Sequence, residues 1–111
     1  MVGGMYGVAQ YYRSKLEAEG YTVRIIKRRG GMLDVFAVGA DRLFIAVVRG
    51  RRKSKVTARD IRRVVETARY LGARPVLALP RYAKLTKEAA RLATKIGVEV
   101  QRLPRLRGGG R

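Results

Sequence analysis

Hydrophobic and polar positions alternate along residues 32–49, and this alternation predicts a β-hairpin. In its first strand one face carries Leu33, Val35 and Ala37, the other carries Asp34, Phe36 and Val38, and residues 39–41 form the turn. One side of the second strand carries Leu43, Ile45, Val47 and Arg49. Because Asp34 is an acidic residue set inside a hydrophobic strand, we expect the function of the chain to depend on this hairpin.

Apolar residues at helical spacing predict three helices, at residues 5–19, 57–71 and 86–96. Thr57, with Asp60 three residues later, is typical of an N-cap for the second helix, and Thr86 is suited to cap the third. A glycine that can take the left-handed conformation follows each helix. The inward-facing residues of the third helix are expected to be Ala89, Leu92, Ala93 and Ile96.

Further strands are predicted at residues 21–26, 75–79 and 98–103, and the segment at 50–55 has no apolar residue, which indicates a solvated loop. The resulting order is α β β β α β α β. Strands interleaved with helices in this way predict an α/β fold with a mixed central β-sheet flanked by helices. We expect one domain at residues 1–103, followed by a basic Gly/Arg tail at 104–111.

Charge is the strongest global feature, because 26 Lys and Arg against 8 Asp and Glu give a formal net charge of +18. Such an excess favours a polyanionic partner, with nucleic acid as the first candidate and an acidic protein or membrane surface as the alternative. The chain has no Cys and no His, which excludes disulfides, thiolate metal sites and imidazole catalysis. Without an apolar run of about 20 residues or a signal-peptide pattern, we expect a cytoplasmic protein, nucleoid-associated if it binds DNA.

The motif order resembles the restriction-endonuclease-like PD-(D/E)XK superfamily, in particular archaeal Holliday junction resolvases. The resemblance rests on GYTVRIIKRRGG, the strand with Asp34, the hairpin, a strand ending in a basic residue, a helix and then GARPVLALP. The later segment LTKEAARLATKIGVEV is similar to the end of Mrr-type endonuclease domains. The resemblance covers roughly residues 8–103 and implies the corresponding nuclease fold.

In that superfamily an Asp and a Glu or Gln converge with a Lys on one or two Mg²⁺ ions, and the metal activates water. The resemblance places Asp34 at the Asp, Val47 at the Glu or Gln, and Arg49 at the Lys. Val47 cannot bind a hard cation, and Arg49 can hold a phosphate but not act as a base. A further Glu would fall near Ala9 or Gln10. The resemblance therefore implies the remnant of a metal site with no cofactor.

Two other interpretations of these residues remain open. An active nuclease, with Mg²⁺ as cofactor, would need a relocated carboxylate, for which the candidates are Glu17, Glu66 and Glu99. Alternatively, Asp34 is a buried carboxylate paired with Arg49 or Lys27 and has no catalytic role. We favour this paired carboxylate.

Clustered basic residues are the candidates for phosphate contact, although a charge run can also be only a solvated surface. They lie after the first strand, after the hairpin and on the second helix: Lys27, Arg28, Arg29, Arg49, Arg51, Arg52, Lys53, Lys55, Arg59, Arg62 and Arg63. Tyr6, Tyr11 and Tyr12 are candidates for stacking on bases, although packing is the better interpretation of Tyr12.

We therefore expect a protein that binds DNA, branched or duplex, through its phosphates, on a nuclease-like fold with a lost metal site. The alternatives are an active Mg²⁺-dependent endonuclease or resolvase, and an RNA-binding or ribosome-associated protein. The resolvases act as dimers, so the resemblance also implies a homodimer.

Overall fold

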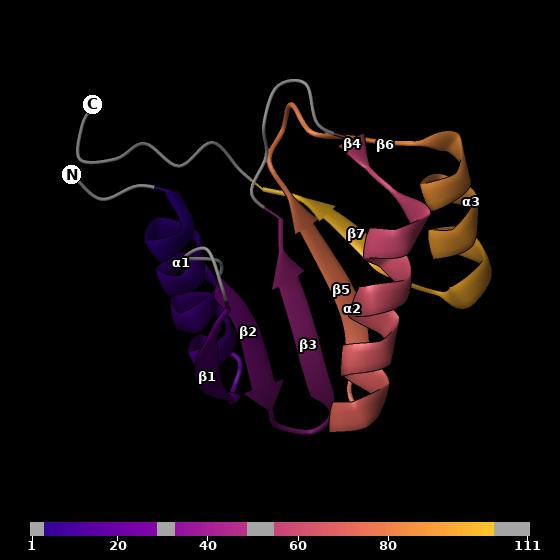
Figure 1. Ribbon diagram of the computed structural model, residues 1–111. Helices are drawn as coiled ribbons and strands as arrows, with labels where there is room; N and C mark the ends of the chain where they lie inside the picture. Colours follow the sequence, from indigo (N-terminus) through magenta and orange to yellow (C-terminus); the bar gives the residue numbers. More distant parts are fainter. Residues whose placement is uncertain (1–3, 29–32, 49–54, 104–111) are drawn as a thin grey trace.

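The computed structural model describes residues 4–28, 33–48 and 55–103. A mixed five-stranded sheet in the order β1-β2-β3-β5-β7 forms the centre of the fold (Figure 1). The pairs β1–β2 and β2–β3 are antiparallel, and β3–β5 and β5–β7 are parallel. The strands are β1 (Thr22–Lys27), β2 (Leu33–Val38), β3 (Arg42–Val47), β5 (Arg74–Leu79) and β7 (Glu99–Arg102). The predicted α/β fold with a mixed sheet is confirmed.

Helices cover both faces of this sheet, as Figure 1 shows. On one face α1 (Gly4–Ala18) packs against β1 and β2, with Val8, Tyr12 and Leu16 in the core beneath it. On the other face lie α2 (Ala58–Leu71) and α3 (Lys87–Ile96), which contact each other and bury a second core. Successive residues of β3 enter the two cores alternately, because side chains of a strand point to opposite faces.

The α2 helix begins and ends where the sequence predicts. The backbone N–H of Thr57 donates to Oδ2 of Asp60 over 2.8 Å, which completes a capping box. Gly72 ends the helix with a φ of 66°, in the left-handed conformation that glycine adopts readily. Its inward residues Ile61, Val64, Val65 and Ala68 are buried, as expected from their spacing.

The hairpin turn is fixed by a network centred on Asp41. The Tyr21 hydroxyl donates to Oδ1 of Asp41, while Nε and Nη2 of Arg74 lie 3.0 and 2.9 Å from Oδ2. The Tyr21 ring lies so close to Gly39 that a Cβ there would be 2.8 Å from Cδ2. The turn therefore needs a residue without a side chain at position 39.

Two details of the sequence-based prediction are wrong. Ile96 is 42% exposed rather than inward-facing, because α3 ends at this residue, past the part of the helix that covers the sheet. Of the predicted loop at 50–55 only Lys55 is described, and it belongs to a strand instead: β4 (Lys55–Val56) pairs in parallel with β6 (Lys84–Leu85). Residues 50–54 lie outside the described residues. Strands of two residues are too short to leave a periodic signal. Within the described ranges no helix is long and apolar enough to cross a membrane.

Candidate functional site

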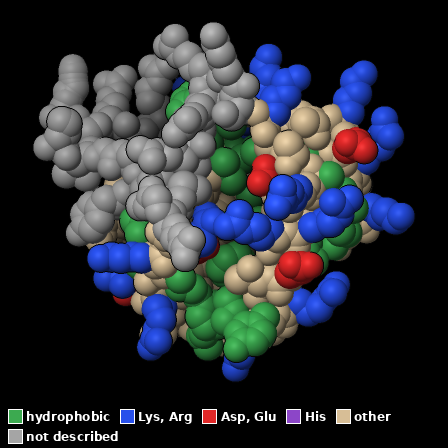
Figure 2. Space-filling model, in the orientation of Figure 1, with side chains coloured by type: hydrophobic (Ala, Val, Ile, Leu, Met, Phe, Trp, Pro, Cys, Tyr) green, Lys and Arg blue, Asp and Glu red, His purple; other side chains and the backbone are tan. Residues whose placement is uncertain are grey.

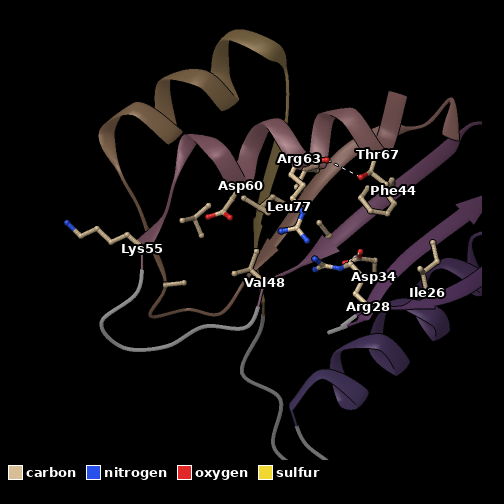
Figure 3. Close-up of a pocket in the computed structure, with 14 residues that line it drawn as sticks. Ile26, Arg28, Asp34, Phe44, Val48, Lys55, Asp60, Arg63, Thr67 and Leu77 are labelled. Carbon is tan, nitrogen blue, oxygen red and sulfur yellow. Dashed lines mark hydrogen bonds and ion pairs between the residues drawn. The ribbon is translucent and has the colours of Figure 1, made fainter. Parts of the chain in front are cut away.

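A cavity of about 330 Å³ lies between the sheet and the buried side of α2 (Figure 3). Its walls are mainly apolar and include Ile26, Phe44 and Leu77. Polar residues from several separate segments of the chain also line it: Arg28, Asp34, Lys55, Asp60, Arg63 and Thr67. The volume lies at the lower end of the range of about 300–1,000 Å³ that is typical of pockets for small ligands.

Asp34 is the buried carboxylate of this site and is only 3% exposed. Its Oδ2 lies 2.6 Å from Nε of Arg28, and its Oδ1 accepts a long hydrogen bond of 3.4 Å from the backbone N–H of Val47. Burial raises the pKa of the Asp34 carboxyl, while the guanidinium of Arg28, the Val47 N–H and the more distant Arg63 act in the opposite direction. Desolvation therefore outweighs the ion pair at this carboxylate.

The partner of Asp34 is Arg28, not the expected Lys27, whereas Arg49 lies outside the described residues. The β1–β2 register explains this difference, because Ile26 pairs with Asp34 and shares its side of the sheet. Period-two alternation then turns Lys27 to the other side and brings Arg28 back. The buried, paired carboxylate was predicted correctly, but its partner depended on a strand register that the sequence alone did not reveal.

Val47 lies on the opposite face of the sheet from Asp34. It packs with the core beneath α1, whereas the residue paired with Asp34 is Ala46. Ala46 and Val48 line the cavity on the Asp34 side. The Val47 side chain therefore does not converge with Asp34, and only its backbone N–H reaches the carboxylate.

The side chains present do not fit a Mg²⁺ site. Among the described residues, no group of three His, Cys, Asp or Glu is placed to hold a metal ion. Asp60 lines the same cavity, but its Oδ2 accepts from the backbone N–H and the hydroxyl of Thr57. Of the candidate relocated carboxylates, Glu17, Glu66 and Glu99 are all exposed and none lines the cavity. We therefore assign no metal-dependent step to this site.

The outer face of α2 is a strip of exposed side chains, here called the α2 strip, consisting of Arg59, Arg62, Arg63, Glu66, Arg69 and Tyr70. These positions recur at three- and four-residue spacing, so they lie along one side of the helix. The strip carries four cations against one carboxylate. Figure 2 shows Lys and Arg side chains outnumbering acidic ones on the face of the molecule that includes α2.

The remaining basic candidates are placed as follows. Lys27 is exposed at the end of β1, and Lys55 is exposed at the rim of the cavity. Outside the described residues lie Arg29, Arg49, Arg51, Arg52 and Lys53. The candidates that line the cavity are Arg28, Lys55 and Arg63. Figure 3 shows the guanidinium groups of Arg28 and Arg63 near Asp34, whereas the ammonium of Lys55 points away from them. Arg59 and Arg62 lie on the exposed side of α2.

Tyr12 packs in the core as expected, whereas the most exposed tyrosine among the described side chains, Tyr70, was not among the predicted candidates. Tyr12 is buried, donates a hydrogen bond of 2.9 Å to Gln101 and meets the ring of Tyr11 edge-on, with 5.2 Å between ring centroids. The Tyr6 side chain lies outside the described residues. Sequence reasoning missed Tyr70, which is 89% exposed on the α2 strip. Its helical spacing from Arg62, Arg63 and Glu66 was the signal that could have identified it.

No family model matches the chain, and no curated protein matches it in sequence. Solved structures do share its fold. EndoMS in its apo form matches with a TM-score of 0.61 and 18% identity over 89% of this chain and 47% of that one. A repair endonuclease from Pyrococcus abyssi matches with a TM-score of 0.60 and 18% identity, over 93% of this chain and 48% of the other.

A third structure, of a protein of unknown function, has a TM-score of 0.59 and 16% identity over 86% of this chain and 56% of its own. The chain thus spans about half the length of the structures that it matches. At these identities the likeness establishes the fold, which is restriction-endonuclease-like, in agreement with the architecture that the sequence resemblance implies.

Proposed function

We propose that this chain binds nucleic acid, DNA in the first place, through the phosphate backbone, on a nuclease-like fold that lacks a metal site. The α2 strip is the observation that carries the proposal, because it sets four arginines on one exposed side of a single helix. Arginine presents planar donor groups that match phosphate oxygens. The net charge of +18 supports a polyanionic partner for the chain as a whole.

The fold adds weight to DNA as the partner, since two of the similar structures are EndoMS and a repair endonuclease. Phosphate contacts position a protein on DNA without reading its sequence. The proposed function therefore includes strong salt dependence and weak sequence preference. RNA is the alternative partner, because its phosphates offer the same charge.

The surroundings of Asp34 favour binding over cleavage. The carboxylate is held by Arg28 at 2.6 Å, and the residue paired with it on the neighbouring strand is Ala46. A hard cation such as Mg²⁺ needs several oxygen ligands, which one paired carboxylate does not provide. Asp34 accordingly acts in this proposal as a structural partner of Arg28.

One experiment tests both parts of this proposal. The protein is incubated with matched duplex DNA, four-way junction DNA, single-stranded DNA and RNA, and binding is measured at rising salt concentration. The same substrates are then incubated with Mg²⁺ or Mn²⁺ and examined for cleavage, with Asp34→Ala as the matched variant.

We expect salt-sensitive DNA binding and no cleavage that depends on Asp34. A flat response to salt would contradict phosphate binding. Cleavage that Asp34→Ala abolishes would establish the active endonuclease instead. Stronger retention of RNA than of any DNA substrate would identify RNA as the partner.

A further inference from the structure

Two lysines that are far apart in the sequence lie side by side where β4 pairs with β6. Lys55 of β4 and Lys84 of β6, here called the lysine pair, are direct partners in the parallel register. The next partners, Val56 and Leu85, pack against the core beneath α2 and α3, so alternation along each strand turns both lysines outwards. Both lysines are exposed, and adjacent strands lie only about 4.8 Å apart.

The lysine pair has no counter-charge within the described part of the chain. Neither lysine takes part in an ion pair there. Asp60, the acidic residue nearest to Lys55 in the sequence, accepts hydrogen bonds from Thr57 instead. Figure 3 shows the Lys55 side chain extending away from the cavity that contains Asp34. The lysine pair therefore places two like charges directly opposite each other, an arrangement that destabilises a pair of strands.

The surface around the lysine pair is also positive. The other cations of residues 81–88 are Arg81 and Lys87, both exposed, against a single acidic residue. Lys55 lies two residues before the N-cap of α2, and Arg59, the first residue of the α2 strip, follows four residues after it. Figure 1 shows β4 and β6 at the end of the molecule where α2 and α3 begin. The lysine pair thus continues the α2 strip beyond the start of its helix.

We propose that the lysine pair binds one backbone phosphate of the nucleic acid that docks on the α2 strip. A phosphodiester has two free oxygens, and the ammonium of each lysine donates to one of them. The bound anion attracts both ammonium groups and offsets their mutual repulsion. Continuity with the arginines of the α2 strip favours nucleic acid over an acidic protein, because a nucleic-acid strand carries phosphates at short, regular intervals. The inference rests on the proposed function and adds a second contact surface to it.

The salt dependence of binding to a labelled DNA duplex tests this contact. Replacing both lysines, Lys55→Gln with Lys84→Gln, should lower the slope of log K against log salt by about 0.9, the value for one phosphate. With equal affinity at 1 M salt, this change is a loss of about eightfold at about 0.1 M salt. The matched control is Lys15→Gln with Lys95→Gln, which removes two exposed cations from α1 and α3 and should leave the slope unchanged.

The stability of the free chain should respond in the opposite direction. Without DNA and at low salt, Lys55→Gln and Lys84→Gln should each raise the midpoint of urea unfolding, because each removes the repulsion. The double variant should raise the midpoint by less than the sum of the two single shifts, since the same repulsion is removed only once. The effects of Lys15→Gln and Lys95→Gln should add, and the unfolding curves also verify that every variant folds.

Five outcomes would count against the inference. An unchanged slope in the double variant would overturn it, and the proposed function would stand if Arg62→Gln still lowers the slope. A fall of about 1.8 would show that the lysines contact two phosphates rather than share one. An equal fall in the control would attribute the effect to net charge alone, and lower unfolding midpoints in both single variants would contradict the repulsion. Poly-glutamate that displaces DNA from the natural chain but not from the double variant would identify an acidic protein as the partner of the lysine pair.

The proposed function fails in a different way. A natural chain whose DNA binding does not respond to salt would reject phosphate binding altogether, and the lysine pair would then have no nucleic-acid ligand. A lower slope in the lysine double variant together with an unchanged slope in Arg62→Gln would keep the lysine pair as a phosphate site and reject the α2 strip.

Discussion

Replacing Arg62 with glutamine should change the salt dependence of DNA binding by a defined amount. The α2 strip presents four arginines, Arg59, Arg62, Arg63 and Arg69, on one side of the helix. If all four contact phosphates, they give a slope of log K against log salt of about −3.6, which is a fall of about 150-fold in affinity between about 50 and 200 mM salt. Arg62→Gln should lower the slope to about −2.7, so the same change in salt weakens binding by only about 40-fold.

Fluorescence anisotropy with a labelled duplex, repeated at five or more salt concentrations, measures this slope for the natural chain and for Arg62→Gln. Lys15→Gln is the matched control, because Lys15 is an exposed cation on α1, on the opposite face of the sheet from α2. Its slope should equal that of the natural chain. An unchanged slope in Arg62→Gln, or an equal change in both variants, would refute the docking of DNA on the α2 strip. Contacts from other basic residues raise both starting slopes without altering the expected difference.

Three further predictions concern the fold around the site. Ile61→Ala should lower the free energy of unfolding in urea by about 2–5 kcal/mol, because Ile61 is fully buried on the inner side of α2. Ile96→Ala, at an exposed helix end, should change it by less than about 1 kcal/mol, and similar losses in the two variants would contradict the assigned core. Gly39→Ala should destabilise the chain by about 1–3 kcal/mol, because its Cβ would lie 2.8 Å from the Tyr21 ring. Most of that loss of stability should disappear in a Tyr21→Ala background, and a loss that persists there would point to another cause. Burial raises the pKa of Asp34, so the folded state holds the carboxyl proton more strongly than the unfolded state. The stability of the natural chain relative to Asp34→Asn, measured by thermal unfolding, should therefore rise as the pH falls from about 7 towards 4. A fall in this relative stability would show that the ion pair with Arg28 outweighs desolvation.

Much of the architecture follows from local patterns in the sequence. The alternation around Asp34 gave the hairpin, and the spacing of Ile61, Val64 and Ala68 gave the buried side of α2. The capping box of Thr57 and Asp60 and the glycines after the helices gave the ends of these elements. These features depend on residues within a few positions of one another, so the sequence contains their full physical cause. The short strands β4 and β6 exist only as partners of each other, which is why no local pattern revealed them.

The candidate site was predictable to a smaller extent. Charge and the position of Asp34 were enough to predict a buried, paired carboxylate in a basic protein. The exposed side of α2, including Tyr70, could also have been found from helical spacing. The cavity itself could not, because its walls come from β1, β2, β3, β4, α2, β5 and the residues before β6, which are distant from one another in the chain.

The sequence by itself determined the order of the helices and of the five strands of the central sheet, the ends of the helices and the excess of positive charge. Only the tertiary structure decided that Arg28 rather than Lys27 holds Asp34, and that Val47 faces the α1 side while Ala46 faces the carboxylate. The physical reason is strand register: a shift of one residue exchanges the two faces of a strand, and register is set by pairing between segments that are distant in the chain. The same pairing assembled the cavity beneath α2.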